Sequence, residues 1–153
     1  MRVKIKRLPE LKDLPLPVRA HKGDSGMDVF AAIDAPVVLE PFVPTKISAG
    51  ISIELPEGIE IQMRPKSSQS AAGILVHFGT CDQPFRGTYQ VILHNLTTKL
   101  QTIRPGQKIG QMVMMRPVYD VEWEEVESLN ETDRGEGGFG STGGSVEITK
   151  TGQ

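Results

Sequence analysis

The most unusual chemistry-bearing segment lies near the C-terminus, where one arginine, one phenylalanine and two hydroxyls stand among glycines. Residues 135–142 follow the spacing Gly-x-x-x-x-Gly-Ser-Thr, in which backbone N–H groups and hydroxyls can converge on a phosphate. The lysine of a P-loop is missing and no strong helix follows, which argues against a P-loop nucleotide-binding domain. The segment favours either a flexible linker or an anion-binding loop, with Arg134 as the cation and Phe139 as a stacking ring.

Two cations and two hydroxyls stand together at residues 64–68, in the order Arg-Pro-Lys-Ser-Ser. Arg64 and Lys66 share a face of an extended chain, because side chains alternate along a strand. Neighbouring cations repel each other unless an anion lies between them, so phosphate binding is one interpretation, although this segment alone does not favour it. The alternative is a solvated strand end, with a serine capping a short helical turn.

Three acidic or amide side chains could serve the same chemistry or have structural roles only. Asp82 lies in Gly79–Gly87, which predicts a hairpin in which its carboxylate either acts chemically or stabilises the turn. Asp28 ends a glycine-rich segment, residues 23–28, whose spacing does not match an EF-hand calcium loop. Gln111 stands in an apolar strand, so its amide must be either a structural bridge or a ligand donor.

The composition fits one domain without general affinity for polyanions. The 153 residues carry a net charge of −2, which argues against stable nucleic-acid binding and against attachment to an anionic membrane. Cys81 is the only cysteine, which excludes an internal disulfide and a thiolate metal site. No apolar run approaches the ~20 residues that span a bilayer, and residues 1–10 lack the apolar block of a signal peptide. We therefore expect an intracellular, cytoplasmic protein, with the nucleus or a virus-infected cell as alternative settings.

Short alternating apolar segments predict an all-β fold of about ten strands. Residues 51–64 alternate on both sides of a Pro-Glu-Gly turn and predict a hairpin, and Pro105-Gly106 predicts a turn between two later strands. Residues 109–115 are apolar almost throughout, which predicts a strand buried on both faces. Only residues 67–72 could form a short helix, ended by the glycine that follows. Further strands are expected at 36–40, 74–77, 88–95, 98–103, 108–116 and 119–126.

The spacing of the turns indicates a sandwich, a barrel or a jelly roll. We expect residues 1–130 to form a single β domain, because no linker interrupts them. Residues 131–153 have too many glycines to hold a strand and predict a flexible tail.

Five motifs, in order along residues 23–143, resemble those of the trimeric dUTPase family. Their order and spacing are more specific than any one motif, and the glycine-rich tail with its phenylalanine is the most distinctive. The motifs read Gly-Asp-Ser-Gly-Met-Asp, Pro-Lys-Ser-Ser, Gly-Thr-Cys-Asp-Gln-Pro-Phe-Arg-Gly, Gly-Gln-Lys-Ile-Gly-Gln-Met and Arg-Gly-Glu-Gly-Gly-Phe-Gly-Ser-Thr-Gly.

The resemblance implies a β jelly roll of the β-clip type, which forms a homotrimer with active sites shared between subunits. It implies hydrolysis of dUTP to dUMP and pyrophosphate, which limits uracil incorporation into DNA and supplies dUMP for dTMP synthesis. Asp82 would activate the water that attacks the α-phosphorus. The backbone near Gly79 would read the uracil edge, and Phe85 would pack beneath the deoxyribose and exclude a 2′-hydroxyl.

The same resemblance implies how the triphosphate and its magnesium are held. Lys66, Ser67, Ser68 and Gln111 would bind phosphates, and Asp28 would support the phosphate and metal region. Mg²⁺ would be held mainly by phosphate oxygens and water, with no direct protein ligand. The tail of another subunit would close over the substrate as a lid. The tail residues expected to touch substrate are Arg134, Phe139, Gly140, Ser141 and Thr142.

Three departures from the family pattern concern fine geometry. Lys66 stands where arginine is usual, which keeps the charge and loses the bidentate fork. Phe85 stands where tyrosine is usual, which keeps the ring and loses the hydroxyl. Pro84 replaces a common acidic residue, and a lysine often found after the second motif is absent. We interpret Arg64 as taking over part of the role of the missing arginine.

Two rival readings come from different functional classes. A dCTP deaminase would share the fold, but Ile92 stands where the deaminases have their catalytic glutamate, and they lack this tail. A regulator that uses nucleotide only as a switch would have no need of an intact Asp82 and an intact tail. Hydrolysis of dUTP is therefore the expected activity.

If Arg64 shares the triphosphate with Lys66, replacing Arg64 by alanine should weaken dUTP binding by about tenfold, because a charge-assisted hydrogen bond to phosphate is lost. Steady-state kinetics on the Arg64→Ala variant measure this effect. Unchanged turnover and unchanged affinity for dUTP would contradict the shared role.

Overall fold

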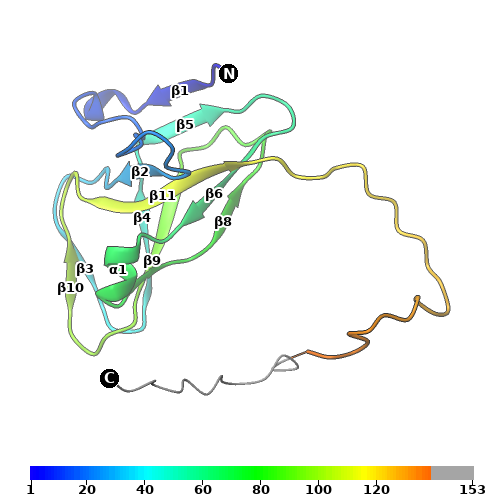
Figure 1. The fold of residues 1–153 in the computed structure, drawn as a ribbon. Helices are drawn as coiled ribbons and strands as arrows, with labels where there is room; N and C mark the ends of the chain where they lie inside the picture. Colours follow the sequence, from blue (N-terminus) through cyan, green and yellow to red (C-terminus); the bar gives the residue numbers. More distant parts are fainter. Residues whose placement is uncertain (139–153) are drawn as a thin grey trace, which may run out of the picture. The chain divides into compact units, whose positions relative to one another are not determined.

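The computed structural model describes residues 1–138, which form eleven strands, one short α-helix and one 3-10 turn (Figure 1). The predicted all-β fold with one short helix is confirmed. The elements are β1 (Lys4–Arg7), η1 (Pro9–Leu11), β2 (Met27–Phe30), β3 (Val37–Leu39), β4 (Pro44–Ser48), β5 (Ile51–Glu54), β6 (Glu60–Arg64), α1 (Ser67–Ala71), β7 (Ile74–Val76), β8 (Gly79–Cys81), β9 (Gln90–Asn95), β10 (Gln101–Ile103) and β11 (Lys108–Met115).

Strand β11 is the centre of a four-stranded sheet with the order β2-β11-β6-β8. All its pairings are antiparallel, and Gln111 lies opposite both Asp28 of β2 and Arg64 of β6. The pairing with β2 shifts register between Lys108 and Gly110. Ile109, Met112 and Val113 are buried, as the sequence predicts, but Met114 is only partly buried and Met115 is exposed, so burial on both faces does not extend to the end of the apolar run.

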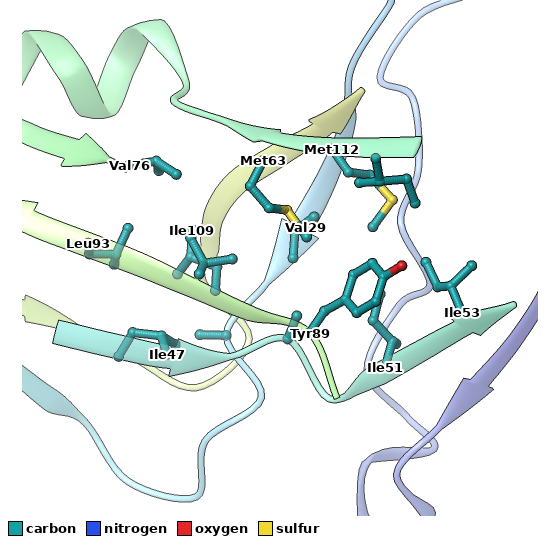
Figure 2. Close-up of a cluster of buried hydrophobic side chains, with 14 of the residues drawn as sticks. Val29, Ile47, Ile51, Ile53, Met63, Val76, Tyr89, Leu93, Ile109 and Met112 are labelled. Atoms are coloured by element: carbon teal, nitrogen blue, oxygen red, sulfur yellow. The ribbon is translucent and has the colours of Figure 1, made fainter. Parts of the chain in front are cut away.

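Three smaller sheets complete the pairing of strands in the described residues. Strand β9 lies between β4 and β7 in a three-stranded sheet, and β1-β5 and β10-β3 form two-stranded sheets. The core joins these sheets, because buried side chains from β4, β5, β7 and β9 meet those from β2, β6 and β11 (Figure 2). Ile5 of β1 and Cys81 of β8 pack against this core from its edge.

Both predicted hairpins are wrong. Strand β5 pairs with β1, whereas β6 pairs with β11 and β8, so residues 51–64 are consecutive strands of different sheets. Residues 79–87 also leave one sheet for another, because β8 pairs with β6 and the following strand β9 pairs with β4 and β7. The alternating pattern identified each strand correctly, but the partner of each strand lies far away in the sequence.

The strand predicted at residues 119–126 is also wrong for the single chain, in which these residues have no regular structure. Their apolar side chains lie exposed, and Trp123 is 94% accessible to solvent. A strand needs a partner for its backbone groups, and no strand of residues 1–138 supplies one here.

Two local predictions are confirmed. Helix α1 is followed by Gly73, whose φ of 78° is the left-handed conformation that glycine adopts without strain. Pro105 and Gly106 form the turn between β10 and β11. Gly73 also lies against Thr97, since a Cβ at Gly73 would come within 2.4 Å of the Thr97 Cγ2 atom.

The chain divides into two units, Met1–Tyr119 and Asp120–Gln153. The first unit contains all the strands and the helix described here. The predicted boundary after residue 130 stays a prediction. Within residues 1–138, no helix is long and apolar enough to cross a membrane.

Candidate functional site

A cavity of about 250 Å³ opens beside strand β8 and the turn that follows it. Its wall is formed by Gly79–Cys81, by Asp82 and Phe85 of the turn, by residues 88–90, and by Met63 of β6. Three of the predicted site residues, Gly79, Asp82 and Phe85, therefore line one cavity. The structure brings them together because β8 pairs with β6 at its base, with Gly79 opposite Met63.

The turn that carries Asp82 is fixed by hydrogen bonds to its backbone. The Phe85 N–H donates to the Asp82 carbonyl at 3.1 Å, which closes the turn around Gln83 and Pro84. Arg86 Nη1 donates to the carbonyls of Gln83 at 2.6 Å and Phe85 at 3.0 Å. Asp82 itself is exposed, so its carboxylate is free to meet a ligand and water.

Cys81 lies beside Asp82 in the cavity wall but is not a nucleophile at neutral pH. Burial raises the pKa of the Cys81 thiol to about 11, and the charge of Asp82 adds to the effect. The thiol therefore stays protonated, and only a thiolate is strongly nucleophilic.

A second cluster forms where β2, the end of β6 and the start of β11 meet. Asp28 is only 6% exposed, and both of its carboxylate oxygens are paired. Lys66 Nζ contacts Asp28 Oδ1, and Lys108 Nζ lies 2.6 Å from Asp28 Oδ2. Burial alone would raise the pKa of Asp28, but hydrogen bonds and positive charge from Lys108 and Lys66 outweigh it and lower that pKa.

Gln111 is a structural bridge in this structure. Its Nε2 donates to the Pro65 carbonyl at 2.8 Å, which ties β11 to the chain just before Lys66. A Cβ on Gly26 would lie 1.8 Å from Gln111 Oε1, so the glycine leaves the space that the Gln111 side chain fills. Gln111 thereby joins the segment containing Asp28 to the segment containing Lys66.

The two serines and Arg64 lie near this second cluster in sequence but differ in their contacts. Ser67 and Ser68 are exposed at the start of α1, and the buried Gln69 anchors that helix by donating to the Lys108 carbonyl at 3.2 Å. Arg64 Nη2 donates to Gln62 Oε1 at 2.9 Å and contacts Met115 Sδ at 3.7 Å. The guanidinium therefore lies along β6 and β11, and its phosphate role stays a prediction.

In the tail, the structure describes only the residues up to 138. Arg134 is exposed, and its Nε donates to the Gly137 carbonyl at 2.9 Å across a turn. The predicted contacts of Phe139, Gly140, Ser141 and Thr142 lie outside the described residues.

Comparison with known proteins identifies the family to which this chain belongs. The model of the dUTPase family matches residues 12–143. The chain belongs to the dUTPase family. The deoxyuridine 5′-triphosphate nucleotidohydrolase of Neorickettsia sennetsu is 46% identical, over 92% of this chain and 95% of that protein. Its counterpart in Anaplasma marginale is 40% identical, over 94% of this chain and 99% of that protein.

Solved structures agree with this family. A variant of the Staphylococcus bacteriophage 80alpha dUTPase with dUpNHpp is 26% identical, with a TM-score of 0.76 over 93% of this chain and 98% of that chain. The predicted dUTPase-like jelly-roll fold and the assignment as a dUTP diphosphatase are both confirmed.

Within the single chain, six of the predicted site residues form two groups. The cavity wall holds Gly79, Asp82 and Phe85, whereas Asp28, Lys66 and Gln111 belong to the second cluster. In the part of the chain that the structure describes, no lysine or arginine lines the cavity. A triphosphate bound beside Asp82 would therefore need its cations from elsewhere.

Sequence reasoning missed three residues that shape these groups. Lys108 is the second cation on Asp28, Arg86 holds the turn, and Tyr89 lies behind Phe85 in the cavity wall. Lys108 and Arg86 stand within the five motifs, so their positive charges could have identified them as candidate site residues. Tyr89 gave no signal, because one aromatic residue before a strand is usually part of a core.

The Asp28 cluster should stabilise the fold in a pH-dependent way. Folding lowers the pKa of Asp28 below its ordinary value of 3.8. The contribution of Asp28 to the free energy of unfolding is therefore complete above pH 3.8, and it is lost as the pH falls through the lowered pKa of the folded state. We expect the free energy of unfolding, measured by urea denaturation at pH 7 and in the acid range, to fall with acidification. The Asp28→Asn variant should be less stable at pH 7 and lose less on acidification. A variant with the same pH dependence as wild type would contradict this account.

Proposed function

We propose that this dUTPase releases dUMP and pyrophosphate by a mechanism in which Asp82 activates the water that attacks the α-phosphorus. The observation that carries the proposal is the cavity beside β8, whose wall unites the exposed carboxylate of Asp82 with Gly79 and Phe85 in a chain of the dUTPase family. Such a reaction would limit uracil incorporation into DNA and supply dUMP for dTMP synthesis. Because it acts on a DNA precursor, we place the proposed activity inside the cell, in the cytoplasm.

Asp82 meets the chemical requirement for the proposed base. Phosphoryl transfer depends mainly on positioning and charge stabilisation, so the protein has to orient a water and accept its proton. Among the described residues of the cavity wall, the titratable groups are the carboxylate of Asp82, the thiol of Cys81 and the phenol of Tyr89. Burial raises the pKa of Cys81 to about 11 and that of Tyr89 to about 12, so neither of these groups is the proposed base, and that role is assigned to the carboxylate of Asp82.

We assign selectivity for the base to Gly79 and selectivity for the sugar to Phe85. The backbone of Gly79 would read the uracil edge, and its missing side chain leaves the backbone accessible. Phe85 would pack beneath the deoxyribose and exclude a 2′-hydroxyl. Phe85 is 44% exposed and lines the cavity, which supports a contact with ligand.

The triphosphate would be held by Lys66, Ser67 and Ser68, with Asp28 positioning the lysine. Asp28 supports this role because it binds Lys66 and Lys108 together, leaving a net positive charge on the cluster. Gln111 would act through the Pro65 carbonyl by fixing the chain before Lys66. The tail would add contacts from Arg134, Phe139, Gly140, Ser141 and Thr142.

Magnesium is the proposed cofactor, and the available donors fit an ion held mainly by the substrate. In the second cluster Asp28 is already paired with two lysines, and among the described residues of the cavity wall Asp82 supplies the single carboxylate. Among residues 1–138 no group of three or more His, Cys, Asp or Glu side chains is placed to hold an ion. Mg²⁺ prefers phosphate oxygens and water to a protein cage, and when bound it neutralises charge on the triphosphate.

We propose a homotrimer in which each active site is shared between subunits. Residues 119–126 support it, because Tyr119, Val121 and Trp123 alternate with acidic residues as in a strand with one buried face, yet they are exposed in the single chain. A strand contributed to another copy would bury these side chains. Sharing would also bring cations to a cavity whose described wall has none.

The proposed reaction is tested by pyrophosphate release with magnesium from dUTP, dTTP, dCTP and UTP. We expect rapid release from dUTP alone, and at least a 100-fold loss in the Asp82→Asn variant, because the amide cannot accept the proton. Asp120→Asn serves as the matched control and should retain activity. Full activity of Asp82→Asn would exclude Asp82 as the base, and ammonia release from dCTP would indicate a deaminase.

The proposed trimer is tested by light scattering on the 16.7 kDa chain. Wild type should have about three times the mass of the chain, and a Val121→Asp/Trp123→Asp double variant should shift to a lower mass, because buried apolar contacts become charged. Glu122→Gln, on the polar side of the same segment, should leave the mass unchanged. A monomeric wild type, or a double variant that stays trimeric, would contradict the role of this segment.

A further inference from the structure

Tyr89 is held rigidly between the cavity and the core. It is 1% exposed, although it also belongs to the cavity wall. Its N–H donates to the Ile51 carbonyl at 2.8 Å, and its carbonyl accepts from the Ala49 N–H at 2.9 Å. Tyr89 belongs to the cluster of buried core residues, and Figure 2 shows its ring beside Ile51 and directed toward Ile53. Two hydrogen bonds therefore hold its backbone, and its side chain is buried in the core.

The ring of Tyr89 supports the ring of Phe85. The two ring centroids lie 5.6 Å apart, with 31° between the ring planes. Gly87 supports the same phenyl group, because a Cβ at Gly87 would lie 2.5 Å from Phe85 Cζ. Phe85 is 44% exposed, so these two supports set the position of a ring that solvent alone would leave free to rotate.

The hydroxyl of Tyr89 does not explain why an aromatic residue stands there. Its oxygen is buried and has no hydrogen-bond partner in the described part of the chain. A buried hydroxyl without a partner is destabilising, so packing alone would favour an apolar residue. Burial raises the pKa of Tyr89 to about 12, and the phenol remains neutral at the pH of the proposed reaction. Tyr89 therefore contributes to the cavity wall through the packing of its ring and not through its hydroxyl.

We propose that Tyr89 is a positioning residue for discrimination against ribonucleotides, because it fixes the Phe85 ring at the sugar end of the cavity. This inference rests on the proposed function, in which Phe85 packs beneath the deoxyribose. An aromatic ring excludes a 2′-hydroxyl only while it cannot retreat from the added oxygen. A displacement of about 1 Å at such a contact is enough to change a rate by one or two orders of magnitude.

The test compares kcat/KM for dUTP and for UTP in wild type, Tyr89→Leu and Tyr89→Phe. Tyr89→Leu keeps an apolar core but removes the flat support, so the dUTP/UTP ratio should fall by about tenfold, mainly through a lower KM for UTP. Tyr89→Phe keeps the ring and should retain the wild-type ratio. Val91→Ala, a buried change in the following strand, should lower the unfolding temperature without changing the ratio.

Gly87→Ala provides a second test if Tyr89→Leu does not fold. Its added methyl group would collide with the Phe85 ring and displace it, so it should also change the dUTP/UTP ratio. An unchanged ratio in folded Tyr89→Leu or in Gly87→Ala overturns the inference, as does an equal loss in Tyr89→Phe and Tyr89→Leu. If wild type does not hydrolyse dUTP, the proposed function fails and this inference fails with it. If wild type hydrolyses dUTP, the dUTP/UTP ratios of the variants decide whether Tyr89 has the inferred role.

Discussion

A buried carboxylate governs how three distant segments of this chain meet. A charge as deeply buried as that of Asp28 is tolerated only when opposite charges lie against it. Lys66, at the end of β6, and Lys108, at the start of β11, supply those charges. The ion pairs therefore act at the edge of the sheet where the backbone of β11 already pairs with β2 and β6. Gln111 adds a hydrogen bond across the same place.

The same arrangement separates the groups that the proposed reaction needs. The cavity beside β8 offers a carboxylate, an accessible backbone and a ring, whereas the lysine of the second motif is engaged with Asp28. A triphosphate carries several negative charges, and placing it beside Asp82 without cations would be unfavourable. Assembly of several copies and closure of the tail would each remove this obstacle. Electrostatics therefore support the proposed trimer, as do the strand-like residues 119–126, which pair with no strand of residues 1–138.

The errors in the predicted pairing share one cause. Alternation in residues 51–54 and 60–64 shows which face of each strand is buried, but it contains no information about the neighbouring strand. A short turn between two strands suggests a hairpin by default, and here the chain uses the turn to change sheets. The sequence did predict the buried strand β11, helix α1 and the glycine after it, because these depend on composition and conformation within a few residues.

The amino-acid sequence by itself determined the all-β class, the faces of most strands and, through the order of five motifs, the dUTPase family. These properties can be read from residue types at short spacings, because the alternation of side chains along a strand and the residue preferences of turns depend only on neighbouring residues. Only the tertiary structure decided that Lys108 shares Asp28 with Lys66, that Gln111 bridges backbone segments, and that Tyr89 supports Phe85. The first two contacts join residues far apart in the chain, and the third depends on a core built from several sheets. Their closeness is set by strand pairing and close packing, which no local pattern specifies.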